Sequence, residues 1–153
     1  MKLDSYSVPV RIAMLAMGLS VVAFTNVRAD LPEHNEVVNI VLKEWYISAN
    51  VYHVKAGPVT FRASNLGKEK HELLIVKTDL SADKLPVYEG KVDEDMVGEM
   101  VGEIEEFSPN KTEEAVFNLA PGRYVLICNL AEREHDTITS HYMKGMRILL
   151  TVE

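Results

Sequence analysis

YVLICNLAEREHDTITSHYMKGM, residues 124–146, contains the only cysteine of the chain, Cys128, at the end of an apolar run. Two histidines and two methionines follow it within the same stretch. A single cysteine cannot form a disulfide within its own chain, and an exposed thiol in an oxidising compartment is oxidised or cross-links two molecules. Cys128 is therefore expected to be either buried and inert or occupied by a bound group.

The start of the chain predicts export. An apolar segment at residues 12–27 follows Lys2 and Arg11, and small residues suited to a signal peptidase come directly after it. The segment is shorter than the roughly 20 residues of a membrane-spanning helix. We therefore predict a signal peptide at residues 1–29 and one mature domain at residues 30–153, without stable membrane insertion after cleavage. The alternative interpretation is that this segment is not cleaved and anchors the protein in the membrane.

Charge and length narrow the classes of function. Residues 1–29 carry three positive side chains and one negative, so their removal changes the net charge from −7 to −9 and leaves 124 residues, enough for one core. Nucleic acids and anionic membranes require a basic face, so neither is expected as a partner. We predict a periplasmic or otherwise exported protein.

Alternation with a period of two residues dominates the mature chain and is typical of half-buried strands. It is clearest where Val59, Phe61 and Ala63 alternate with polar residues before the break at Asn65-Leu66-Gly67. Further strands are expected at 38–42, 51–54, 71–76, 103–107, 114–119, 123–130 and 148–152.

This pattern predicts an all-β fold, a Greek-key β-sandwich of seven to eight short strands with antiparallel pairing. Residues 78–100 read differently, because Pro86 and Gly90 interrupt them and either Asp79 or Ser81 is suited to cap a short helix. We expect this segment to form a helical or irregular excursion packed on one edge.

Strand parity places potential metal ligands together. Cys128 shares a strand face with Tyr124 and Leu126, and His71 shares one with Leu73 and Ile75. If these apolar neighbours face the core, Cys128 and His71 point inward at strand ends. The chain then returns to its last strand through residues 141–146, so His71, Cys128, His141 and Met146 are expected to meet at one end of the sandwich.

These residue types fit one task. A thiolate and two imidazoles with a distant thioether form the copper site of blue electron-transfer proteins. The His-x4-Met spacing of His141 and Met146 lets both reach one metal, and Gly145 permits the tight backbone between them. His135 has no such spacing and is expected to be solvated among charged neighbours.

The sequence resembles the cupredoxin (blue copper) family, of the plastocyanin, azurin and sulfocyanin type, over nearly the whole mature chain. The resemblance lies in Val59-Thr60-Phe61, Asn65-Leu66-Gly67 and His71-Glu72-Leu73, then residues 120–128, and His141-Tyr142-x-x-Gly145-Met146 before a closing strand. It implies His71, Cys128 and His141 as equatorial ligands of one copper ion, with Met146 as the axial ligand.

Two departures from the family pattern are visible. Cupredoxins usually place the second histidine a few residues after the cysteine, whereas residues 131–140 intervene here, and we expect them to bulge outward. Many members carry an asparagine after the first histidine, where it steadies the cysteine loop. Glu72 stands there instead, and Asn129 or Asn65 is the expected substitute.

The expected function is one-electron transfer with redox proteins that dock near an exposed edge of His141, with Tyr142 and Met143 in an apolar rim. A copper chaperone or store of the same fold is the alternative, favoured if the long loop makes the site loose. An oxidase or nitrite reductase needs further histidine clusters, which His34, His53 and His135 do not indicate, so no enzyme is expected. A metal-free β-sandwich used for adhesion or assembly is also conceivable, but the pattern of potential metal ligands would then be a coincidence.

Overall fold

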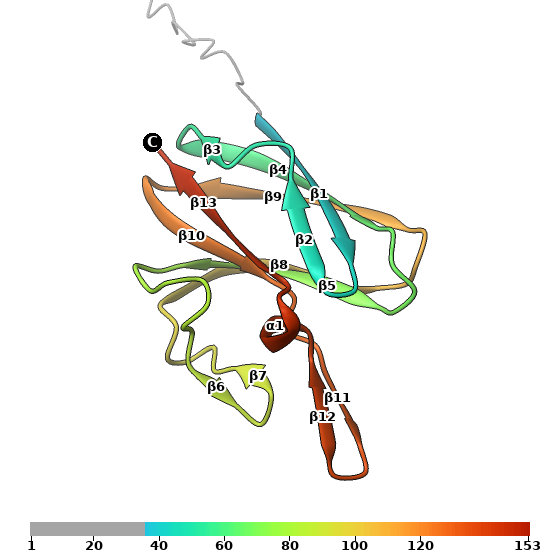
Figure 1. Ribbon diagram of the computed structural model, residues 1–153. Helices are drawn as coiled ribbons and strands as arrows, with labels where there is room; N and C mark the ends of the chain where they lie inside the picture. The colour runs from blue at the N-terminus through green and yellow to red at the C-terminus, as the bar shows by residue number, and fades with distance from the viewer. Residues whose placement is uncertain (1–35) are drawn as a thin grey trace, which may run out of the picture. The chain divides into compact units, whose positions relative to one another are not determined.

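The computed structural model describes residues 36–153, so the predicted signal peptide, the residues just after it and His34 lie outside the described part. Two β-sheets pack face to face (Figure 1). The first has the strand order β2-β1-β4-β9, with β1 at Glu36–Lys43, β2 at Tyr46–Ala49, β4 at Gly57–Asn65 and β9 at Thr112–Leu119. The second has the order β3-β13-β10-β5-β8, with β3 at His53–Val54, β5 at His71–Lys77, β8 at Glu99–Phe107, β10 at Gly122–Ile127 and β13 at Arg147–Val152.

The predicted all-β sandwich is confirmed, with two differences in detail. These two packed sheets contain nine strands, because the short strand β2 joins the eight expected ones, of which 51–54 is observed as the two-residue strand β3. Pairing is mixed, since β1 runs parallel to β4 and β3 runs parallel to β13. Strands β8 and β9, which the turn at residues 108–111 connects, belong to different sheets, so this turn crosses from one layer to the other.

The main core lies between the sheets and follows the predicted alternation. In β4 the side chains of Val59, Phe61 and Ala63 are fully buried, and alternate residues of β1, β5 and β10 pack against them. Tyr124 also donates its hydroxyl hydrogen to the carbonyl of Ala120 at 2.7 Å, so this large ring is buried with its polar atom satisfied. The same face of β10 continues to Cys128, which therefore lies in the core cluster.

A second apolar cluster covers the outer face of β5 and β10. Leu74 and Val76 of β5 and Val125 and Ile127 of β10 contact Leu85, Val92 and Val97 of the excursion. These two strands are buried on both faces, which explains why they read as continuous apolar runs. The excursion therefore packs on the face of this sheet, so the expectation that it would pack on one edge is wrong.

Of the two alternatives expected for residues 78–100, a helical or an irregular excursion, the helix does not form. This segment instead forms a small hairpin of β6 (Val87–Tyr88) and β7 (Lys91–Val92). Its two turn residues, Glu89 and Gly90, both have positive φ, as two-residue hairpin turns favour. The local capping signal is overridden because Leu85, Val92 and Val97 all turn toward the sheet.

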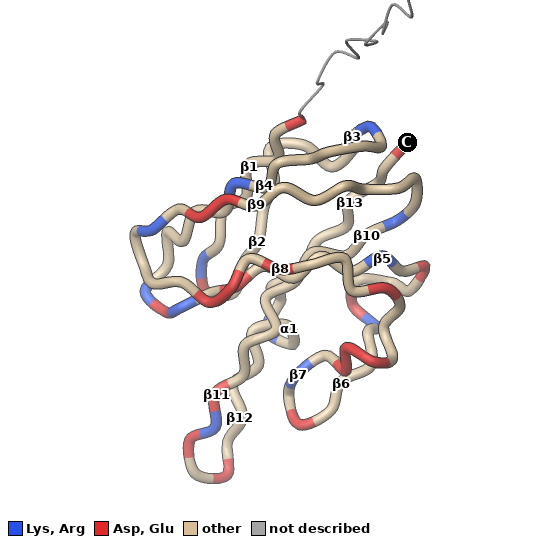
Figure 2. Tube along the Cα trace, turned by 180° about the vertical axis from the view of Figure 1, so that it is seen from behind, with Lys and Arg blue, Asp and Glu red and all other residues tan. Residues whose placement is uncertain are grey.

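Residues 131–140 form a hairpin, β11 (Ala131–Glu134) and β12 (Thr137–Ser140), that projects away from the sheets as expected (Figure 1). It contains residues of both charges, and β8 is rich in glutamate residues (Figure 2). The one described helix is the single turn α1 (His141–Lys144). No helix among residues 36–153 is long and apolar enough to cross a membrane.

Candidate metal centre

The four predicted ligand residues all stand where an element begins or ends, at the same end of the sandwich. His71 is the first residue of β5, and Cys128 directly follows β10. His141 begins α1, and Met146 directly precedes β13. Antiparallel pairing of β10 with β5 and β13 brings these ends together, since Ile127 lies opposite both Leu74 and Arg147.

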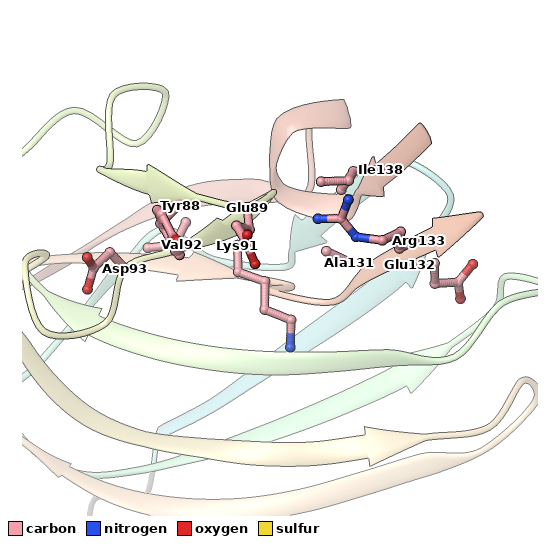
Figure 3. Close-up of a pocket in the computed structure, with 9 residues that line it drawn as sticks. All are labelled: Tyr88, Glu89, Lys91, Val92, Asp93, Ala131, Glu132, Arg133 and Ile138. Carbon is pink, nitrogen blue, oxygen red and sulfur yellow. The ribbon is translucent and has the colours of Figure 1, made fainter. Parts of the chain in front are cut away.

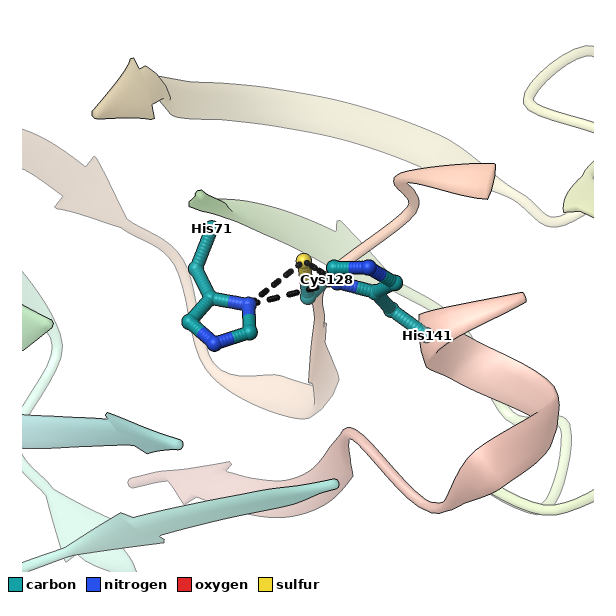
Figure 4. Close-up of side chains that lie close together, drawn as sticks. All are labelled: His71, Cys128 and His141. Carbon is teal, nitrogen blue, oxygen red and sulfur yellow. Dashed lines mark hydrogen bonds between the residues drawn. The ribbon is translucent and has the colours of Figure 1, made fainter. Parts of the chain in front are cut away.

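The donor atoms of three of these residues form a small triangle (Figure 4). The Cys128 sulfur lies 3.3 Å from Nδ1 of His141 and 3.8 Å from Nδ1 of His71, and the two Nδ1 atoms are 3.2 Å apart. Nitrogens at about 2.0–2.1 Å from a shared metal and a sulfur at about 2.3 Å lie about 3.4–3.8 Å from one another. The triangle therefore fits one metal ion with small adjustments.

Burial keeps the donors uncharged without a metal. Cys128, His71 and His141 are fully buried. Desolvation raises the pKa of the Cys128 thiol to about 12, although the backbone N–H groups of Glu72 and Leu130 hydrogen-bond its sulfur and oppose this rise. Desolvation also lowers the pKa of both histidines, so their rings are neutral and offer lone pairs. Forming the thiolate here requires a positive ion beside it.

A one-turn helix explains the His-x4-Met spacing. Ser140 caps α1 by accepting the N–H of Met143 at 3.1 Å. Gly145 ends the turn with φ +129°, and the N–H of Met146 then donates to the carbonyl of His141 at 3.0 Å. The turn places Met146 beside Cys128, whose N–H donates to the Met146 carbonyl at 3.2 Å. Met146 is fully buried in the core cluster that contains Cys128.

The intervening hairpin leaves the site intact because its base is closed. Ala131 pairs with Ser140, and the N–H of His141 donates to the carbonyl of Leu130 at 2.9 Å. The chain thus returns to its starting point after residues 131–140. His141 therefore lies as close to Cys128 as it would if a short loop replaced the hairpin.

Glu72 itself secures the cysteine loop. Its carboxylate accepts the N–H of Asn129 at 2.9 Å, and desolvation raises the pKa of Glu72 to about 7 against the opposing effect of this hydrogen bond. Asn129 anchors the loop to the excursion through both main-chain groups of Val92, at 2.6 and 3.1 Å. Asn65, also buried, bonds to Gly67 and Glu69 just before His71.

The structure adds two residues that the sequence did not indicate. Glu44 and Trp45, in the turn between β1 and β2, contact one histidine each. An oxygen of Glu44 lies 3.4 Å from Nε2 of His71, and the Trp45 ring centroid lies 5.0 Å from that of His141 at 75°. The pKa of Glu44 is lowered from 4.5 to about 2. Desolvation raises this pKa, but hydrogen bonds from backbone N–H groups together outweigh that effect. No periodic pattern marks this turn as part of the site.

Two expectations about the surface are wrong. His141 has no exposed edge, because its exposed fraction is 0% and Trp45 lies against it. Tyr142 is not part of an outer rim, since its ring packs in the second apolar cluster and its hydroxyl bonds to Ala82 and Leu85. Met143 is 63% exposed, as expected.

The other described histidines lie outside the triangle. His135 is exposed at the tip of the β11–β12 hairpin, as expected, and His53 is exposed in β3. A cleft of about 400 Å³ lies between this hairpin and the β6–β7 hairpin (Figure 3). Nine residues line it, and none is a histidine or cysteine. The donor chemistry is therefore concentrated at the triangle and not in this cleft.

No protein-family profile and no curated protein matches the sequence. Solved structures match the fold. The dithionite-reduced auracyanin from the photosynthetic bacterium Roseiflexus castenholzii aligns with a TM-score of 0.57 and 21% identity, over 78% of this chain and 98% of its own. An auracyanin B structure aligns with a TM-score of 0.53 and 19% identity, over 77% and 88%. These similarities show that the chain adopts the predicted cupredoxin fold.

Proposed function

We propose that this protein carries single electrons by means of one copper ion held by His71, Cys128 and His141, with Met146 as a weak axial ligand. The observation that supports this most directly is the triangle of two imidazole nitrogens and one sulfur, all fully buried. A His2Cys set with a distant methionine is the ligand set of blue-copper electron-transfer sites.

The bound copper supplies the one-electron couple, and the chain supplies a constant environment for it. Cys128 is held between two backbone N–H groups, and His141 is held by a capped turn. Burial of all three donors keeps water away from them. A site whose donors cannot shift or gain a water ligand changes little between oxidation states, which favours fast electron transfer.

A carrier is preferred over a copper chaperone or store. The chaperone reading depends on a loose loop between Cys128 and His141. The base of that loop is closed by the Ala131–Ser140 pair and by the bond from His141 to Leu130, so the ligands stand on well-anchored backbone. The similar auracyanin from Roseiflexus castenholzii is described as dithionite-reduced, which agrees with a redox role for this fold.

The proposal assigns no catalytic reaction to the chain. An oxidase or nitrite reductase uses a second copper site, and His71, Cys128 and His141 are the one ligand cluster of this kind within residues 36–153. The proposal also places the mature domain, residues 30–153, outside the cytoplasm after removal of residues 1–29. N-terminal sequencing of the protein from its native host tests that placement.

Copper binding and redox cycling test the function. The protein loaded with Cu(II) is expected to show an intense sulfur-to-copper absorption band and to be reduced and reoxidised repeatedly with the copper retained. Cys128→Ser should remain folded but colourless, whereas the matched control His135→Gln, altered in the exposed hairpin, should keep the band. Loss of copper to a mild chelator in each cycle would support a chaperone, and absence of colour would reject the site.

A further inference from the structure

We infer that Trp45, and not the edge of His141, is the group through which electrons enter and leave this site, an inference that rests on the proposed electron-carrier function. The indole ring is partly buried, and it lies against the fully buried His141. The ring centroids are 5.0 Å apart with an interplanar angle of 75°, which is an edge-to-face contact. The ring thus continues the aromatic path outward from the imidazole.

His141 itself offers no surface for a redox partner. Its exposed fraction is 0%, and its Nε2 atom is buried with no hydrogen-bond partner. A partner molecule therefore cannot contact the imidazole directly. The partner that approaches this end of the sandwich meets Trp45 and the exposed residues beside it, which include Tyr46 and Lys144.

Three contacts hold Trp45 in place, two through the backbone of its turn and one at the ring. The Glu44 carboxylate accepts the N–H groups of Lys68 and Glu69 at 2.6 and 2.7 Å, which fixes the turn that carries Trp45. The ammonium group of Lys144 lies 5.7 Å from the indole centroid, in cation–π range. The carbonyl of Trp45 lies against Gly145, where a Cβ atom would be only 3.0 Å away.

These contacts matter because electron tunnelling weakens steeply with distance and crosses an empty or aliphatic gap less readily than a contacting π system. In one transfer, a single electron leaves the reduced site and reaches a one-electron oxidant, such as the redox centre of a partner protein. The site is oxidised by one electron and the partner is reduced by one. No bond forms or breaks, no proton moves, and Trp45 is left unchanged.

Fluorescence tests the contact without any electron transfer. Trp45 is the only tryptophan of the chain, so all tryptophan emission reports on it. Binding of Cu(II) is expected to quench this emission strongly in the wild-type protein and much less in the Cys128→Ser variant. Unchanged emission in a protein that binds copper and is coloured would show that Trp45 does not contact the site.

Electron self-exchange between two copies of the protein, measured by NMR line broadening at high salt, tests the path. Trp45→Phe keeps an aromatic ring and should stay close to the wild-type rate. Trp45→Leu covers His141 without a π system and should slow exchange several-fold, at an unchanged absorption band. Met96→Leu, a matched change at an exposed methionine in the excursion of residues 78–100, should have no effect.

The outcomes separate the inference from the function on which it rests. A coloured, reversibly cycling protein in which Trp45→Leu exchanges at the wild-type rate, or in which Met96→Leu is equally slow, overturns the inference alone. A protein that never forms the coloured site overturns the function. Labelling of Cys128 by a thiol reagent in the metal-free protein checks that the residue at position 45 still shields the site from solvent. If the Trp45→Leu variant reacts with the reagent, Trp45→Met takes its place in the comparison.

Discussion

Glu72 provides a quantitative test of the structure through the pH dependence of stability. Desolvation raises the pKa of this carboxyl from 4.5 to about 7 in the metal-free fold. The native state therefore keeps a proton that the unfolded chain releases between these two values. The stabilisation is fully present below about pH 4.5 and is lost as the pH rises through about 7. At about 1.4 kcal/mol per pH unit, the gap corresponds to about 3.5 kcal/mol in all, of which about 3 kcal/mol is lost between about pH 4.5 and about pH 8.

The variant Glu72→Gln isolates this contribution. Glutamine keeps an oxygen that can accept the N–H of Asn129, but it does not titrate. Urea unfolding of both metal-free proteins at about pH 4.5 and about pH 8 should show that the wild type loses about 3 kcal/mol relative to the variant over this range. The other titrating groups are present in both proteins, so the comparison removes their contributions apart from the charge interaction of Glu72 with Glu94 and Glu103.

A matched control fixes the interpretation. Glu134→Gln removes a carboxylate from the exposed β11–β12 hairpin and should retain the pH dependence of the wild type. The reasoning is refuted if Glu72→Gln shows that same dependence, because the buried carboxyl would then not be the group that titrates.

Three further perturbations have defined outcomes. Replacing residues 132–139 by a single glycine should preserve the copper absorption band, because the paired residues Ala131 and Ser140 have Cα atoms only about 5 Å apart. A colourless product would show that the hairpin shapes the site. Gly145→Ala should cost about 2 kcal/mol in urea unfolding, since φ is +129° and the new Cβ meets the Trp45 carbonyl at 3.0 Å; an unchanged midpoint contradicts this. The affinity for Cu(II) should rise about tenfold per pH unit near about pH 8, because binding displaces the proton of Cys128, whose pKa is about 12. Calorimetry in buffers of different ionisation enthalpy measures the released proton.

Much of the site was predictable because its donors stand at strand ends. Alternation along a strand fixes which side chains share a face, so the parity of Tyr124, Leu126 and Cys128 was enough to place the sulfur in the core. The spacing of His141 and Met146 is that of a single capped turn, which is also a local property. The closed base of the hairpin explains why ten intervening residues did not disturb the arrangement.

The excursion at residues 78–100 shows where local signals fail. Its capping residues predict a helix, but burial of Leu85, Val92 and Val97 against β5 and β10 stabilises a hairpin instead. Whether the outer face of a sheet is covered depends on a packing partner elsewhere in the chain. The continuous apolar runs of β5 and β10 were the only sign of this cover in the sequence.

The sequence by itself determined eight strands of the two packed sheets, the face on which each donor lies and the backbone turn that joins His141 to Met146, because all of these follow from bonds and contacts within a few residues. Only the tertiary structure decided that Glu44 lies beside His71 and that Trp45 lies against the buried His141. Those contacts join the β1–β2 turn to side chains that are remote in the sequence. No periodicity records such a meeting, since it is set by the way the two sheets pack.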